Sequence, residues 1–173
     1  FAAAGAKVVS ITAKDKLRKQ LSKNLDLTRG NVSFSSERAD QCMLAENGIE
    51  NVLELVGMPL PDMYSMELSL FVLEAGVKLL ERERRDLMYL SLTDFVQHKY
   101  APAESEARRF YQELDRHFGR LEALGAVVAL TAAVLVLVIG LAAAGAFNGC
   151  GSTAADVGRP SAAVSSSPHG GVA

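Results

Sequence analysis

Asp94 and His98 have the residue types and the spacing for metal chemistry. They lie four positions apart, directly after the apolar run 86–92, in the sequence TDFVQHKYAP. If this segment is helical, the carboxylate and the imidazole reach the same side. An oxygen and a nitrogen ligand suit a divalent cation such as zinc, although a zinc site uses three or four ligands. The alternative is a helix-capping Asp and a surface His.

Lys14 and Lys16 have the charge to bind an anion. They flank Asp15 just after the β-branched run KVVSIT, residues 7–12. Two cations are slightly unfavourable at the start of a helix, where the macrodipole is already positive, so they weakly favour an anionic ligand nearby. The alternative is a solvated charge cluster at a helix start.

The remaining reactive side chains are interpreted as structural. His117 lies in a charged, amphipathic stretch and is predicted to be exposed on a helix. Cys42 is predicted to be buried on a helix, with no adjacent base that would make it a nucleophile. Cys42 and Cys150 lie far apart in the sequence and indicate no disulfide framework.

The candidate residues follow predicted strands in an alternation of strands and helices. Strands are predicted at 7–12, 86–92 and 126–131, with a weaker one at 31–36. Helices are predicted at 13–25, 36–55 (with Asn47-Gly48 as a candidate break), 65–84 and 104–124. This order predicts an α/β fold with a parallel sheet and flanking helices, in which ligands lie beyond the carboxyl ends of the strands.

Apolar spacing predicts which side of each helix packs inward. In the first helix the stripe is Leu17, Leu21 and Leu25. In the helix at 65–84 the inner face is Leu68, Phe71, Val72, Ala75, Leu79 and Leu80. In the helix at 104–124 it is Phe110, Leu114, Phe118 and Leu121.

Charge and composition divide the chain. The 18 Lys and Arg against 20 Asp and Glu give a net charge of -2, which indicates no nucleic-acid partner. Residues 126–147 carry no charge, and as a helix they would extend about 33 Å, enough to cross a bilayer core. The first part of this run is also the predicted strand 126–131. From 149 onward the chain is rich in Gly, Ser, Ala and Pro, which predicts disorder.

Several longer segments resemble the phosphonoacetate hydrolases of the alkaline phosphatase superfamily. The resemblance covers residues 5–132 and is carried by the segments TAKDKL, ELVGMPLPD and TDFVQHKYAP. It implies a partial alkaline-phosphatase-like sheet and the hydrolysis of the carbon–phosphorus bond of phosphonoacetate to acetate and phosphate. Family enzymes use two zinc ions and a threonine nucleophile. By this resemblance, Asp94 and His98 hold one zinc ion, while Lys14 and Lys16 bind the substrate carboxylate.

Other parts of the family site have no match in this sequence. The threonine nucleophile and an early metal-binding aspartate are expected upstream of Phe1, so no catalytic residue is assigned. Where the family continues with Asp-His-Gly, this chain has Ala133-Val134-Leu135, and the role of a final histidine is not transferred to His169. We therefore expect at most one partial zinc site and no activity from this chain alone.

Three domains and three function classes follow. Residues 1–132 are predicted to be an incomplete hydrolase domain, 133–148 an apolar tail or membrane segment, and 149–173 a disordered tail. The first class is a cytoplasmic hydrolase segment that binds a small phosphonate. The second is a membrane-anchored α/β domain, held through residues 126–147, that binds an anion without turnover. The third is a structural remnant of a frameshifted or fused gene. The sequence does not determine the oligomeric state.

Overall fold

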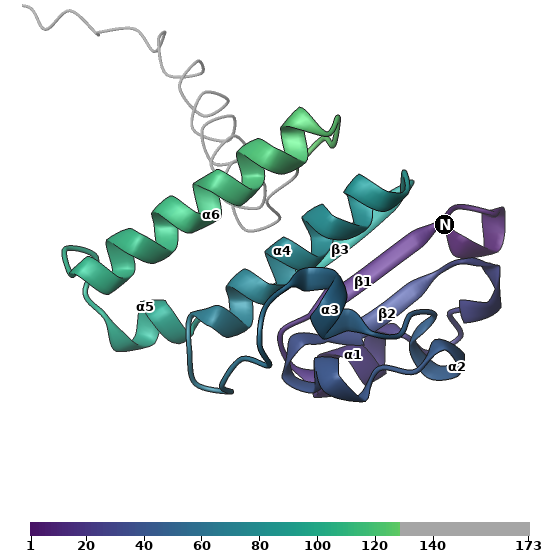
Figure 1. The fold of residues 1–173 in the computed structure, drawn as a ribbon, viewed down its shortest axis with the longest axis horizontal. Helices are drawn as coiled ribbons and strands as arrows, with labels where there is room; N and C mark the ends of the chain where they lie inside the picture. Colours follow the sequence, from purple (N-terminus) through teal and green to yellow (C-terminus); the bar gives the residue numbers. More distant parts are fainter. Residues whose placement is uncertain (129–173) are drawn as a thin grey trace, which may run out of the picture. The chain divides into compact units, whose positions relative to one another are not determined.

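The computed structural model describes residues 1–128, which contain a three-stranded parallel sheet flanked by helices (Figure 1). The strands are β1 (Val8–Thr12), β2 (Val32–Ser35) and β3 (Leu87–Ser91), in the order β2-β1-β3. β1 is central, because Val9 lies opposite Val32 on one side and Met88 on the other. The predicted α/β class and the strands predicted at 7–12, 31–36 and 86–92 are confirmed.

Helices connect and follow these strands. Their bounds are α1 (Asp15–Leu21), α2 (Leu44–Asn47), α3 (Val52–Val56), α4 (Glu67–Arg82), α5 (Phe95–Lys99) and α6 (Ser105–Ala123). Short 3-10 segments are η1 (Ala2–Ala4), η2 (Leu27–Arg29) and η3 (Ser36–Gln41). The carboxyl ends of β1 and β3 lead directly toward α1 and α5, so Lys14 and Asp94 begin from the same edge of the sheet.

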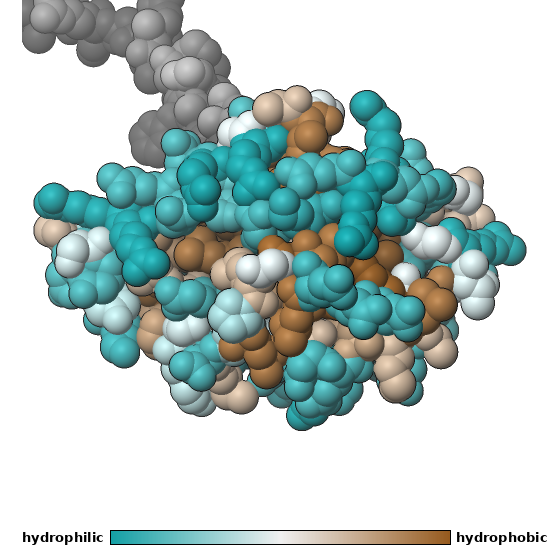
Figure 2. All heavy atoms as spheres, viewed as in Figure 1, coloured by the Kyte–Doolittle hydropathy of each residue, from teal (hydrophilic) through white to brown (hydrophobic). Residues whose placement is uncertain are grey.

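α4 packs on two sides. Leu68 and Phe71 join the apolar core formed with β1 and β2, whereas Leu70 and Leu73 pack with Phe110 of α6 in a second core. The sequence predicted one inner face, and the second follows from the packing of α6 against α4. In Figure 2 hydrophilic residues cover the outer side of α6, and hydrophobic residues show beneath it.

Two helix predictions are corrected. The helix predicted at 13–25 ends at Leu21, and Asn24 has a left-handed backbone with φ 62°, which does not continue a helix. Leu17 and Leu21 are 36% and 43% exposed, so the predicted apolar stripe is not buried by the described residues. The segment 36–55 is divided into η3, α2 and α3, and the break predicted at Asn47-Gly48 is present where α2 ends.

The predictions for the C-terminal part can be tested only to residue 128. Residues 126–128 belong to no strand or helix, so this part of the strand predicted at 126–131 is not formed. The apolar segment 133–148 and the tail 149–173 lie outside the described residues. Within the described residues, no helix combines the length and the hydrophobicity needed to span a membrane.

Candidate functional site

The connection from β3 to α5 holds Asp94 and His98. Thr93 is fixed just before them, because its backbone N–H donates to the Oγ of Ser69 at 3.0 Å and its own Oγ1 lies 3.2 Å from the same oxygen. Ser69 is buried in α4, so a core helix determines where α5 begins. Asp94 occupies the N-cap position, but its side chain makes no capping hydrogen bond.

The side chains of Asp94 and His98 meet across one turn of α5. Asp94 Oδ2 lies 2.9 Å from His98 Nε2, and the backbone N–H of His98 donates to the carbonyl of Asp94 at 3.0 Å. The two side chains are 78% and 79% exposed. The prediction that both side chains reach one side of a helical turn is confirmed. The His98 side chain lies on the surface, as the capping alternative also required.

Lys14 reaches the same region from the end of β1. It is the extended N-cap residue of α1, and its ammonium donates to the carbonyl of Met63 at 3.3 Å. The same Nζ lies 5.3 Å from the centroid of the Tyr64 ring. Both partners belong to the loop between α3 and α4.

These side chains line one open hollow of about 550 Å³. Its lining residues are Lys14, Met63, Tyr64, Leu92, Thr93, Asp94, Phe95 and His98. Three of the four residues predicted from the sequence therefore come together at the carboxyl edge of the sheet, although β1 and β3 are far apart in the chain. We call this feature the Lys14–His98 hollow.

Lys16 is placed differently. It is exposed on α1 and is not among the residues that line the Lys14–His98 hollow. Lys14 is the extended N-cap residue, whereas Lys16 lies within the first turn of α1. The expectation that both lysines face one hollow is met only for Lys14.

The donor chemistry of the hollow fits zinc, but the number of ligands falls short. Two ligand atoms bound to one tetrahedral zinc at about 2.0–2.1 Å lie roughly 3.3 Å apart. The 2.9 Å between Asp94 Oδ2 and His98 Nε2 is close to that spacing, so a small separation of the side chains would admit the ion. Among residues 1–128 no group of three or more Asp, Glu, His or Cys residues could hold a metal.

Comparison with solved structures shows what this arrangement is similar to. No model of a known protein family matches the chain. The chain is 52% identical to the phosphonoacetate hydrolase of Sinorhizobium meliloti 1021 in its complex with phosphonoacetate, with a TM-score of 0.71. The structure of the same enzyme with phosphonoformate matches equally well. This chain is related to phosphonoacetate hydrolase.

The relationship covers one part of the enzyme. The match extends over 73% of this chain but only 31% of the Sinorhizobium phosphonoacetate hydrolase. The identity is high enough for the fold of the matched part to be shared, and the matched enzyme acts on a carbon–phosphorus bond. The complete activity of a phosphonoacetate hydrolase is a proposal for this chain, because about two thirds of the enzyme has no counterpart in the match.

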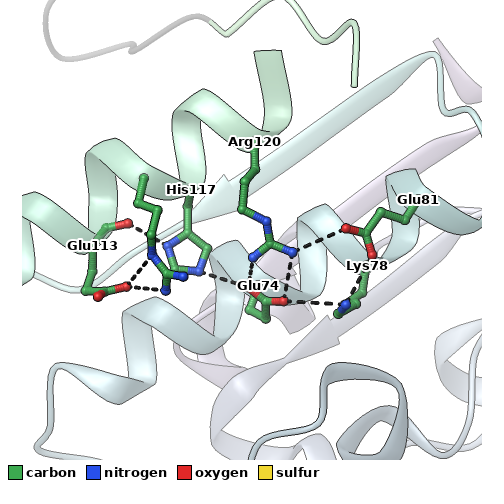
Figure 3. Close-up of polar contacts among 7 residues, drawn as sticks. Glu74, Lys78, Glu81, Glu113, His117 and Arg120 are labelled. Atoms are coloured by element: carbon green, nitrogen blue, oxygen red, sulfur yellow. Dashed lines mark hydrogen bonds and ion pairs between the residues drawn. The ribbon is translucent and has the colours of Figure 1, made fainter. Parts of the chain in front are cut away.

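A polar cluster away from the hollow joins α6 to α4 (Figure 3). His117 is only 3% exposed, and the prediction that it lies on the surface is wrong. Its Nδ1 lies 2.6 Å from the carbonyl oxygen of Glu113, and its Nε2 lies 3.1 Å from Glu74 Oε2. Arg120 also donates to both oxygens of Glu74. Because both neighbours of the ring are acceptors, the contacts are satisfied when both ring nitrogens carry protons.

The position of His117 could have been predicted from spacing. It follows Phe110 by seven residues and precedes Leu121 by four, which places it on the inner face of α6. The charges of the neighbouring arginines indicated a solvated stretch and outweighed this signal. Figure 3 shows that the ring lies between the two helices, so its role is to hold α6 in place.

Asp15 and Cys42 are two further reactive groups that lie outside the Lys14–His98 hollow. Asp15 is buried and forms ion pairs with Arg18 Nε at 2.6 Å and Lys19 Nζ at 2.9 Å, which fix the first turn of α1. Cys42 is half-buried at the end of η3, not on a helix as predicted. Burial raises the pKa of the Cys42 thiol to about 11, so little of the reactive thiolate is present at neutral pH.

Proposed function

We propose that residues 1–128 form part of the active site of a zinc-dependent phosphonate hydrolase. Asp94 and His98 hold one zinc ion, and Lys14 binds the carboxylate of phosphonoacetate. The observation that carries the proposal is that Lys14, Asp94 and His98 line one hollow. This hollow lies in a chain 52% identical to an enzyme crystallised with phosphonoacetate. Lys16 adds a second cation from the surface of α1.

The reaction would add water across a carbon–phosphorus bond. The methylene carbon of phosphonoacetate gains a proton and the phosphorus gains an oxygen, so that acetate and phosphate leave. When bound, zinc supplies positive charge that stabilises the phosphoryl oxygens. Asp94 and His98 position that charge at one end of the hollow, and the ammonium of Lys14 holds the carboxylate so that the substrate lies in one orientation.

Calorimetric titration of the 173-residue chain with phosphonoacetate in the presence of zinc tests this proposal. A hydrogen bond between two charged groups contributes about 1.5–3 kcal/mol, so Lys14→Met is expected to raise the Kd about 10- to 150-fold. Lys23→Met, at an exposed lysine, is the matched control and leaves the Kd unchanged. Methylphosphonate, which has no carboxylate, should bind the original chain and Lys14→Met equally. Equal phosphonoacetate affinity in both proteins would refute the assignment of Lys14.

Turnover is a separate measurement. Catalytic zinc sites use three protein ligands, whereas the described residues bring two together. We therefore expect the 173-residue chain to bind phosphonoacetate without releasing phosphate, as followed by ³¹P NMR. Zinc-dependent phosphate release that disappears in His98→Ala would show that this expectation of inactivity is wrong.

A further inference from the structure

We propose that Tyr64 is a positioning residue for Lys14: its ring holds the Lys14 ammonium at the wall of the Lys14–His98 hollow. The proposal rests on the function assigned above to that hollow, and it extends that function to the loop between α3 and α4. Tyr64 and Lys14 both line the hollow, and no role for Tyr64 was predicted from the sequence.

The loop that carries Tyr64 is anchored at both ends. Met58 packs against the main apolar core, and Met66, the N-cap residue of α4, is 8% exposed. Pro59 and Pro61 restrict the backbone in between. Tyr64 itself is 75% exposed, so the loop presents a large aromatic ring to solvent instead of to the core. Since the core fixes this ring little, a contact with a charged neighbour can favour one position of it.

Lys14 supplies that contact. Its Nζ lies 5.3 Å from the ring centroid, within the range of about 6 Å over which a cation is attracted to an aromatic face. The carbonyl of Met63, the residue before Tyr64, accepts one N–H of the same ammonium at 3.3 Å. Two consecutive loop residues therefore hold one cation, the first through its backbone and the second through its side chain.

The arrangement leaves the ammonium able to bind substrate. An ammonium has three N–H donors, and Met63 uses one of them. The ring attracts the positive charge without consuming a directed hydrogen bond, which keeps donors for a carboxylate. A long lysine side chain that is already fixed also loses less rotamer entropy when it binds an anion. Tyr64 thereby favours binding although it need not touch the carboxylate.

The first experiment detects the contact without any substrate. Reductive methylation with ¹³C-formaldehyde places two labelled methyl groups on each lysine of the 173-residue chain while keeping the charge. The Lys14 signal, assigned by its loss in Lys14→Arg, should show an upfield ring-current shift compared with that of Lys16. Tyr64→Leu should remove this shift and Tyr64→Phe should keep it. Tyr111→Leu, at another exposed tyrosine, is the matched control. A Lys14 signal that is unshifted, or unchanged in Tyr64→Leu, overturns the proposal.

The second experiment measures the consequence for binding. An exposed cation–π contact contributes about 0.5–1 kcal/mol, so Tyr64→Leu should raise the Kd for phosphonoacetate about two- to fivefold. Tyr64→Phe should restore the original affinity, and methylphosphonate binding should not change. Equal phosphonoacetate affinity in the original chain and Tyr64→Leu overturns the positioning role. If the original chain binds no phosphonoacetate, the proposed function has failed, and the ring-current shift still decides whether Tyr64 holds Lys14.

Discussion

Asp94 Oδ2 and His98 Nε2 lie 2.9 Å apart at the surface of α5. Both side chains line the Lys14–His98 hollow together with Lys14. The two side chains belong to one helical turn, so their separation is determined locally. Their placement against Lys14 is determined by the sheet, because β1 and β3 are adjacent and parallel.

Ser69→Ala should destabilise the chain and disturb the start of α5. The substitution removes the acceptor of the Thr93 N–H, which lies 3.0 Å from Ser69 Oγ. An unsatisfied backbone donor costs about 1–3 kcal/mol. Urea unfolding followed by circular dichroism should show a loss in this range. Ser105→Ala, on the exposed first turn of α6, serves as the control with little change. A loss no larger than that of the control would show that Ser69 does not fix this connection.

Glu74→Gln should loosen the contact between α4 and α6. The carboxylate accepts from His117 Nε2 at 3.1 Å and from Arg120 Nη2 at 3.1 Å, and the amide would place a donor against one of these donors. The expected loss in free energy of unfolding is about 1–3 kcal/mol. Glu50→Gln, at an exposed carboxylate, is the matched control. Equal stability of the two variants would contradict the structural role of the cluster in Figure 3.

The same carboxylate predicts how stability depends on pH. Burial alone would raise the pKa of Glu74, but hydrogen bonding and charge from Arg120, together with His117 and Lys78, outweigh it and hold the pKa below its ordinary value of 4.5. A carboxyl group with a lowered pKa in the folded state contributes stability that is present above its unfolded pKa. That contribution is lost as the pH falls through the folded pKa.

Acid titration of the unfolding free energy measures this contribution. The part due to Glu74 should be constant above about pH 5.5 and should decrease as the pH falls through and below 4.5. Glu74→Gln should show a smaller decrease over the same interval, since its side chain does not titrate. Parallel pH profiles for the two proteins would mean that Glu74 has no lowered pKa in the fold.

Gly48→Ala should be strongly destabilising. Gly48 has φ +69°, and a Cβ at this position would lie 2.0 Å from the backbone oxygen of Asn31. Left-handed backbone and the overlap together cost at least about 2 kcal/mol. Gly119→Ala, in α6 with no atom within 4 Å of the added carbon, should instead stabilise by about 0.5–1 kcal/mol. Thermal unfolding of the two variants should therefore shift in opposite directions.

The sheet could be predicted from the sequence because its signals are local. The β-branched run that ends at Thr12 and the apolar run that ends just before Thr93 each form a strand. The length of α1 could not be predicted, because Leu17, Leu21 and Leu25 continue the helical spacing, whereas α1 ends at Leu21 and Asn24 has a left-handed backbone. Exposure of these leucines depends on what packs over α1, which spacing does not encode.

In the site, the contact within one helical turn could be predicted, whereas the contact between distant segments could not. Asp94 and His98 meet within one helical turn, so their spacing was sufficient. Lys14 and Tyr64 meet through a fold in which the loop after α3 returns to the end of β1, and no local pattern indicates such a contact. Lys16 was grouped with Lys14 because the two are close in sequence, whereas only Lys14 lines the hollow.

Zinc titration of His98 by side-chain NMR tests the central claim most directly. In the 173-residue chain, the His98 ring signals should respond to zinc, and the buried His117 should not. Asp94→Ala should raise the zinc concentration needed for this response by about tenfold or more, because one of two ligands is lost. Asp115→Ala, an exposed carboxylate on α6, should not. An identical zinc response of His98 in the original chain and in Asp94→Ala would contradict a shared metal site.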